Sequence, residues 1–166
     1  VLDDPTIAAV LCSRGGYGTM RIIDKIDFTL FRKNPKWLIG FSDITVLHAV
    51  LNKQGYASIH GAMAKAIAHE SNNRESVEAL KDTLFGNKLS YTLPSSGYNR
   101  RGKATGQLVG GNLSLLYALL GTSYNPIKQG AVLFIEDVSE ALYHVDRMLQ
   151  ALRLSGVFDR VSGVIV

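Results

Sequence analysis

The chain has 166 residues, 46% hydrophobic and 19% charged, a balance that excludes disordered and fibrous proteins. Lys and Arg number 18 and Asp and Glu 14, so the net charge is +4, without a basic arm, and nucleic acid is not an expected partner. No stretch approaches the roughly 18 to 20 apolar residues of a membrane-spanning helix, so no membrane association is expected. A single cysteine, Cys12, excludes an internal disulfide.

Three apolar runs in the first part of the chain predict buried strands, at residues 7–13, 37–41 and 56–60. Helical spacing follows the first run at 20–26 and the second at 44–51. Strands that alternate with helices are typical of a parallel sheet covered on both faces. Functional residues in such sheets lie where strands end and helices begin.

A polar stretch at 69–102, rich in Pro, Ser, Gly and Asn near its end, predicts a segment between two domains. Beyond it the pattern predicts a strand near 103–109, a helix at 113–120, a strand at 131–135 and an amphipathic helix from Leu142 to Leu152. The fold class is therefore α/β, with domains at 1–68 and 103–166.

Both ends of the sequence indicate a piece of a longer protein. The chain begins at Val1 rather than Met, and it stops within the apolar run 161–166, which predicts a buried strand. We therefore expect further residues on either side.

Ser42 lies in Gly40-Phe-Ser-Asp43, between a buried strand and a helix. Such a turn holds a serine hydroxyl at the sheet edge, next to N–H groups that can stabilise an oxyanion. Ile44 stands where Gly-x-Ser-x-Gly has its last glycine, so the α/β-hydrolase motif is not present. The alternative is that Ser42 only caps the following helix.

Two glycine-rich turns are candidate binding loops. Arg14-Gly-Gly-Tyr-Gly18 can present N–H groups and a guanidinium to an anion, or it can be a plain tight turn. It matches neither dinucleotide nor P-loop fingerprints. Asn112, after two glycines, is a substrate contact or a helix cap.

Glu136 and Asp137 follow an apolar strand, where a carboxylate could orient an imidazole or cap the next helix. None of the four histidines is identified as a general base by its pattern. His48 and His144 are expected to be packing or surface residues on helices, and His60, which could face the site, is interpreted as a structural histidine. Cys12 is interpreted as a core residue, and no ligand spacing indicates a metal site.

Five motifs together carry a family resemblance, in the order Ser13-Arg-Gly-Gly-Tyr-Gly18, Ile39-Gly-Phe-Ser-Asp-Ile-Thr45, Ile59-His-Gly61, Leu108-Val-Gly-Gly-Asn-Leu113 and Leu133-Phe-Ile-Glu-Asp137. Over nearly the whole chain the sequence resembles the LD-carboxypeptidases, the muramoyltetrapeptide carboxypeptidase family of serine peptidases. The resemblance implies a Rossmann-like N-terminal domain, here incomplete, followed by part of a smaller mixed α/β domain.

The resemblance also implies roles for particular residues. Ser42 would be the nucleophile and Glu136 the carboxylate of a Ser-Glu-His triad, and the N–H groups of Gly16 and Asp43 would form the oxyanion hole. The family position of the triad histidine falls after residue 166, so the four histidines here do not include it. Loss of that base costs about a millionfold in turnover, so this stretch alone is expected to be nearly inert.

Arg14, Gly15 and Asn112 are the candidate substrate contacts. By the same resemblance, the substrate is a murein tetrapeptide that loses its terminal D-alanine in the bacterial cytoplasm during cell-wall recycling. No cofactor is implied, and the family admits a homodimer.

Two other functions stay open. A microcin-immunity type peptidase, within the same family, acts on acyl-aminoacyl nucleotides and would need aromatic residues to stack on a base, for which only Tyr91 and Tyr98 are available between the domains. A non-catalytic anion-binding module would use the Arg14 loop and leave Ser42 as a cap.

Overall fold

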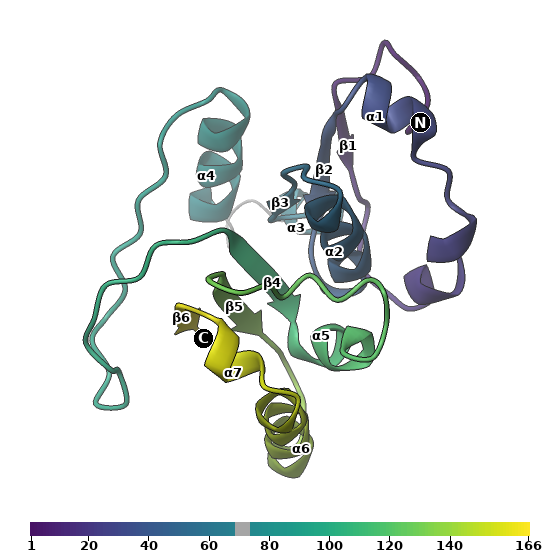
Figure 1. The fold of residues 1–166 in the computed structure, drawn as a ribbon. Helices are drawn as coiled ribbons and strands as arrows, with labels where there is room; N and C mark the ends of the chain where they lie inside the picture. The colour runs from purple at the N-terminus through teal and green to yellow at the C-terminus, as the bar shows by residue number, and fades with distance from the viewer. Residues whose placement is uncertain (69–73) are drawn as a thin grey trace.

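The computed structural model describes residues 1–68 and 74–166, so His69 lies outside the described residues. This part of the chain forms two parallel sheets of three strands each (Figure 1), which confirms the predicted α/β class. In sheet order, the strands are β1 (Ala9–Leu11), β2 (Trp37–Gly40) and β3 (Ile59–His60), then β4 (Leu108–Asn112), β5 (Val132–Glu136) and β6 (Gly163–Ile165).

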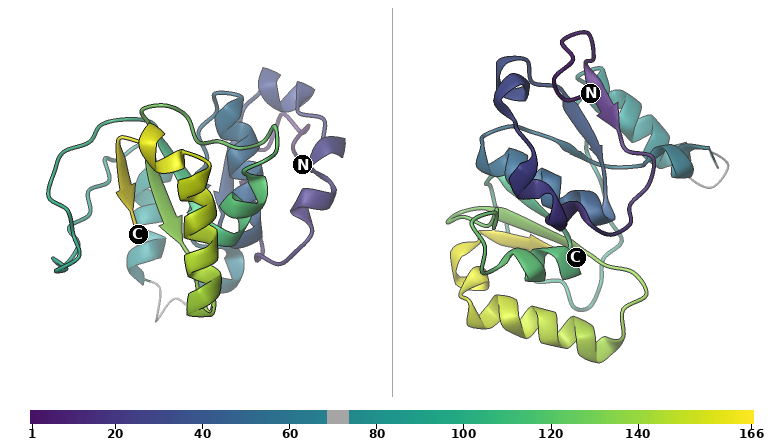
Figure 2. Two further views of the ribbon diagram at one scale, coloured as in Figure 1. Left: turned by 60° about the horizontal axis from the view of Figure 1, so that its bottom comes forward. Right: turned by 90° about the vertical axis from the view of Figure 1, so that its right-hand side faces the viewer.

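Helices and short turns lie between the strands. They are the 3-10 turns η1 (Thr19–Arg21), η2 (Ile23–Lys25) and η3 (Ser42–Ile44) and the helices α1 (Thr29–Lys33), α2 (Thr45–Lys53), α3 (Ala64–Ile67), α4 (Arg74–Leu84), α5 (Leu113–Leu119), α6 (Leu142–Leu154) and α7 (Val157–Arg160). Of these, α3 and α4 lie between the last strand of the first sheet and the first strand of the second. The helix α2 touches both β3 and β4, so it lies between the two sheets, whereas α6 lies at the outer side of the second half (Figure 2). None of the described helices is long and apolar enough to cross a membrane.

The first half of the chain has its own hydrophobic core between β2 and α2. Phe31 and Val46 are fully buried there, and Leu38 and Leu51 nearly so. Burial of each such side chain contributes about 1.5–3 kcal/mol before the entropy of ordering is counted. Cys12 is half-buried and packs against this core, and its burial raises the pKa of the thiol, which agrees with the expected core role.

A second core lies between β5, α5 and α6. Leu133, Leu152 and Val157 are fully buried in it, and Met148 is nearly so. The amphipathic stripe predicted for α6 is confirmed except at its first residue, because Leu142 is 88% exposed. Each half therefore buries its own apolar face.

The prediction of a helix at 20–26 is wrong, because the chain there makes two short 3-10 turns. Gly18, at φ 121°, precedes them, and Thr19 donates to Asp43 Oδ2 through its amide at 3.0 Å and its hydroxyl at 2.7 Å. This long-range anchor fixes the start of the segment. Its expected apolar face is divided, because Ile22 is 51% exposed whereas Ile23 is buried in the first core.

Two strands differ in extent from the sequence expectation. The strand expected at 56–60 pairs only over its last two residues, and the one expected near 103–109 runs over Leu108–Asn112. Gly110 and Gly111 thus lie inside β4 rather than in a turn. A Cβ at Gly110 would stand 1.9 Å from the Phe134 carbonyl oxygen, so glycine is there for a close approach of β4 to β5.

A buried hydrogen bond joins the two halves. The amide of Asn112, at the end of β4, donates to Thr45 Oγ1 at the start of α2, at 3.1 Å. Thr45 is fully buried and Asn112 is 8% exposed. A Cβ at Gly111 would lie 2.6 Å from the same hydroxyl oxygen, so the glycine lets the strand reach the helix.

We expect Thr45→Val to lower the free energy of unfolding by about 1–3 kcal/mol, because the buried Asn112 amide would lose its acceptor. Urea unfolding at neutral pH measures this loss. Thr45→Ser keeps the hydroxyl and is the matched control, with a smaller loss. Equal unfolding curves for wild type and Thr45→Val would contradict this role of the bond.

Candidate active site

Ser42 stands at a strained turn between β2 and α2. Its φ is 61°, and it shares a positive value with one other non-glycine residue, Ser139, among the described residues. The N-cap position of η3 is Phe41, and no side chain makes a capping hydrogen bond there, so the helix-cap interpretation of Ser42 is wrong. Strain of this kind is typical of a serine nucleophile at a strand-to-helix turn.

Glycines on two elements make room for this turn. A Cβ at Gly40 would lie 3.0 Å from Ile44 Cγ1. The absence of a side chain at Gly40 therefore leaves room for Ile44, which stands where the Gly-x-Ser-x-Gly motif has its second glycine. A Cβ at Gly15 would lie 2.8 Å from Ser42 Cβ and 3.0 Å from Ser42 Oγ. The loop of Arg14 to Gly18 therefore packs directly against the serine.

Asp43 connects the same loop to the turn through its side chain. Its carboxylate is the acceptor of the two Thr19 hydrogen bonds, and the residue is 8% exposed. Its backbone N–H belongs to the first helical turn, where N–H groups have no intrahelical acceptor. Gly16, in the loop, has φ 156° and open space around its Cα, and Arg14 is exposed.

Glu136 is the last residue of β5 and pairs with Asn112 of β4. Burial raises the pKa of its carboxyl group, with a further contribution from Asp137 and an opposing one from the Asn112 side chain. Its Oε1 is buried and has no hydrogen-bond partner among the described residues. Because Asn112 is bonded to Thr45, three residues after Ser42, the serine turn and Glu136 border the same junction between the sheets.

Asn112 does cap a helix, one of its two expected roles. Its Oδ1 accepts from the Leu115 amide at 3.4 Å and from the Ser114 hydroxyl at 2.7 Å. Asp137 does not cap α6, because its Oδ1 accepts from the adjacent Val138 amide and the N-cap position is Ala141.

His60 does not have the satisfied structural role expected of it. Its Nδ1 is buried without a partner among the described residues, and its Nε2 lies 3.9 Å from Glu136 Oε1. Burial, with a smaller contribution from His48, lowers the pKa of His60 to about 4. The strand pattern of the sequence could have indicated that His60 lies near the site. His60 ends a strand whose parallel neighbour ends at Gly40, just before Ser42, and the carboxyl ends of parallel strands meet at one edge of a sheet.

The other two described histidines have the expected structural roles. His48 is buried, with Nδ1 2.8 Å from Ser58 Oγ and Nε2 2.9 Å from the Gly40 carbonyl oxygen. Since a carbonyl only accepts, Nε2 carries the proton and Nδ1 accepts from the serine. Burial lowers the pKa of His48, and the neutral ring supports the strand that leads to Ser42. His144 lies on α6, half-exposed, 3.1 Å from Glu140.

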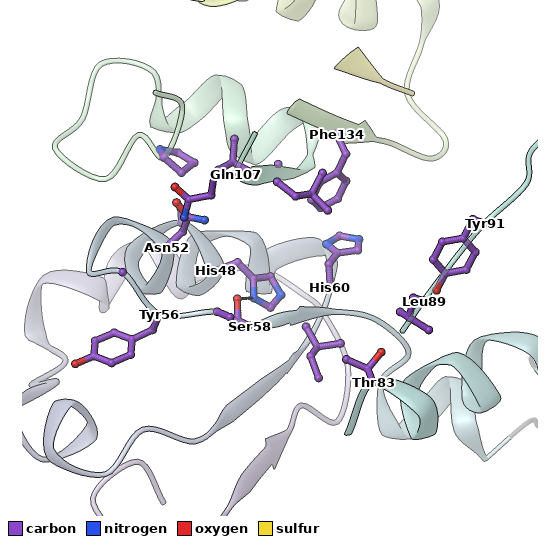
Figure 3. A pocket seen from close by; sticks show the side chains of 18 residues that line it. His48, Asn52, Tyr56, Ser58, His60, Thr83, Leu89, Tyr91, Gln107 and Phe134 are labelled. Atoms are coloured by element: carbon purple, nitrogen blue, oxygen red, sulfur yellow. Dashed lines mark hydrogen bonds between the residues drawn. The ribbon is translucent and has the colours of Figure 1, made fainter. Parts of the chain in front are cut away.

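A cavity of about 710 Å³ adjoins this junction (Figure 3). His60 and Phe134 lie next to each other in its lining, and their rings pack edge to face with centroids 4.9 Å apart. Tyr91, from the segment before β4, also belongs to the lining. None of its lining residues is Asp, Glu, Lys or Arg, and within the described chain no cluster of metal-ligating side chains exists.

The chain matches two models of one family, an LD-carboxypeptidase N-terminal domain at residues 1–61 and an LD-carboxypeptidase C-terminal domain at residues 105–166. Together they span most of the sequence, in the expected order. The chain belongs to the LD-carboxypeptidase family. The glycine loop and the serine turn fall in the N-terminal match, and Asn112 and Glu136 fall in the C-terminal match.

Curated relatives and solved structures agree with this family. A probable murein peptide carboxypeptidase of Bacillus subtilis (strain 168) is 41% identical over 167 residues, which are 98% of this chain and 52% of that protein. The chain spans about half the length of the curated relatives it matches.

Among solved structures, a muramoyltetrapeptide carboxypeptidase from Oxalobacter formigenes aligns with a TM-score of 0.81 at 30% identity, over 98% of this chain and 56% of that one. MccF in complex with glutamyl sulfamoyl guanosine aligns with a TM-score of 0.83 at 28% identity, over 98% and 58%. The fold of this chain is therefore similar both to a muramoyltetrapeptide carboxypeptidase and to MccF.

We expect Gly15→Ala to slow the reaction of Ser42 with a fluorophosphonate in the intact protein, because the new methyl group would displace the serine side chain. Mass spectrometry of the labelled protein measures the rate. Gly121→Ala is the matched control, since a Cβ at Gly121 meets nothing within 4 Å. Equal labelling rates for both variants would refute the close contact.

We expect Glu136→Gln to raise the melting temperature at pH 7.5. A carboxyl group whose pKa is raised by folding stabilises the protein below its unfolded value, here 4.5, and loses that contribution as pH rises through the folded value. The difference from wild type should therefore shrink as pH falls toward 4.5. Glu140→Gln removes the same charge just before α6, and the same gain in both variants would show a general charge effect instead.

Proposed function

We propose that the protein carrying this chain is a serine-type LD-carboxypeptidase that removes the terminal D-alanine from murein tetrapeptides. The observation that carries the proposal is Ser42 at φ 61° in the Gly-Phe-Ser-Asp turn, with Gly15 packed against its side chain. A strained backbone costs free energy, and the Ser42 side chain makes no helix-capping hydrogen bond that would offset this cost. Such strain favours a role as a nucleophile. The family membership and the named activities of the relatives support the same reaction.

In the proposed mechanism, Ser42 Oγ attacks the carbonyl carbon of the terminal peptide bond as its proton passes to a histidine base. The N–H groups of Gly16 and Asp43 donate to the oxyanion of the tetrahedral intermediate. Collapse breaks the C–N bond, the base gives its proton to the leaving amine, and D-alanine departs. A water molecule then hydrolyses the acyl-serine by the same steps.

Glu136 would orient that histidine and stabilise its charged form. Its place at the carboxyl end of a parallel strand, beside the junction that holds the Ser42 turn, supports this role. The histidine itself would come from residues after 166, as the family resemblance implies.

Arg14, Gly15 and Asn112 are proposed to contact the substrate. The exposed guanidinium of Arg14 suits the free carboxylates of a murein peptide. We further propose domains at 1–68 and 103–166 joined by 69–102, a homodimer, and a cytoplasmic role in cell-wall recycling.

We expect the intact protein to release D-alanine from a murein tetrapeptide, and Ser42→Ala to lower that turnover by about a millionfold. A coupled D-amino-acid oxidase assay measures the release. Fluorophosphonate should label wild type and not the variant.

Ser139→Ala is the matched control, because Ser139 also has a positive φ, 65°, and is exposed. Its activity and labelling should equal those of wild type. Release of D-alanine by Ser42→Ala at the wild-type rate would end the serine-peptidase proposal.

A second candidate is a serine peptidase of the microcin-immunity type that acts on acyl-aminoacyl nucleotides. The observation in its favour is Tyr91, which lines the cavity beside His60 and could stack on a base, whereas Tyr98 is 98% exposed. The match to MccF with glutamyl sulfamoyl guanosine supports the same possibility. Cleavage of a glutamyl nucleotide analogue in preference to the tetrapeptide would favour this candidate.

A further inference from the structure

Three buried polar atoms around the end of β5 have no partner among the described residues: His60 Nδ1, Glu136 Oε1 and Asp137 Oδ2. A buried carboxylate oxygen without a donor is costly, more so when the group is ionised. In a triad, one oxygen of Glu136 would bind the histidine base. The other oxygen then needs a donor from elsewhere in the fold.

His60 is the group placed to supply that donor. Its Nε2 is 3.9 Å from Glu136 Oε1, about 1 Å longer than an N–H···O hydrogen bond. Catalytic hydrogen bonds are often long before substrate binds and tighten in the complex. The edge-to-face contact of His60 with Phe134, two residues before Glu136 on the same strand, holds the ring against β5.

The charge state of His60 follows from its surroundings. The titratable side chains that face it are His48 from α2, at a ring distance of 6.0 Å, and Glu136 from β5. With a pKa lowered to about 4, chiefly by burial, the ring is neutral at pH 7 and has one N–H to donate. A proton on Nδ1 would leave a lone pair of Nε2 facing the carboxylate, so the proton belongs on Nε2.

We propose that His60 is a positioning residue whose Nε2–H donates to Glu136 Oε1 and so orients the carboxylate and keeps it ionised. The inference rests on the proposed role of Glu136 in the triad. Besides His60, the groups around Glu136 are Asp137, next in the chain, and Asn112 from β4. Burial and Asp137 raise the pKa of the carboxyl, the Asn112 side chain lowers it, and a donor on the unpartnered Oε1 would lower it further.

The test compares His60→Leu with His60→Gln in the intact protein. The leucine variant loses the donor, and kcat/KM should fall about ten- to hundredfold, mostly in kcat. The acidic limb of its pH profile should move to higher pH, because the pKa of Glu136 rises. Glutamine places an N–H near the position of Nε2 and should restore most of the rate and the wild-type acidic limb.

His144→Leu is the matched control, since it breaks a histidine–glutamate pair on the surface of α6. It should change neither the rate nor the profile. Wild-type kinetics in His60→Leu would overturn the proposal. An equal loss of kcat/KM in His60→Leu and His60→Gln, with the acidic limb of the pH profile unchanged, would also overturn it.

Nuclear magnetic resonance gives a readout that does not depend on activity. Ring ¹⁵N shifts should show His60 protonated on Nε2 at pH 7, and a carboxyl ¹³C titration should show a higher pKa for Glu136 in His60→Leu. Protonation on Nδ1 would overturn the inference. If wild type neither releases D-alanine nor reacts with fluorophosphonate, the proposed function fails, while these spectra still decide the contact.

Discussion

The buried hydrogen bond between the Asn112 amide and Thr45 Oγ1 joins the two halves of the chain, whose sheets are separate and whose cores meet where Leu115 and Tyr124 pack against the first one. Its partners are 67 residues apart, and both are buried. The contact requires Gly111, because any side chain there would collide with Thr45. Ser42 lies three residues before Thr45, and Glu136 lies beside Asn112 in its sheet. The geometry of the candidate site therefore depends on this junction.

Backbone strain and buried polar atoms without partners occur together around the junction. Ser42 has a positive φ, and polar atoms of His60, Glu136 and Asp137 are buried without partners among the described residues. Folding alone would select against each of these features, because strain and unsatisfied polar groups cost free energy. Their occurrence near the same junction supports the proposal of a functional site there.

Histidines show how far side-chain roles can be predicted from the sequence. His48 and His144 were correctly expected to be packing and surface residues, since helix position alone largely decides exposure. The satisfied structural role expected for His60 is wrong, because the charged group nearest its Nε2 is Glu136, which is 76 residues away and on another sheet. Strand position indicates the sheet edge at which His60 lies, but only the folded chain shows that its ring meets Phe134 and Glu136 of β5.

The sequence by itself determined the α/β class, most helices and strands, the strand-end positions of Ser42 and Glu136, and the family, because these follow from local periodicity and short motifs. Tertiary structure alone decided the rest. The segment at 20–26 makes 3-10 turns tied to Asp43 through Thr19, and Gly110 pairs within β4, where Phe134 leaves no room for a side chain. Contacts between residues far apart in sequence have no local pattern, so they appear only when the chain is folded.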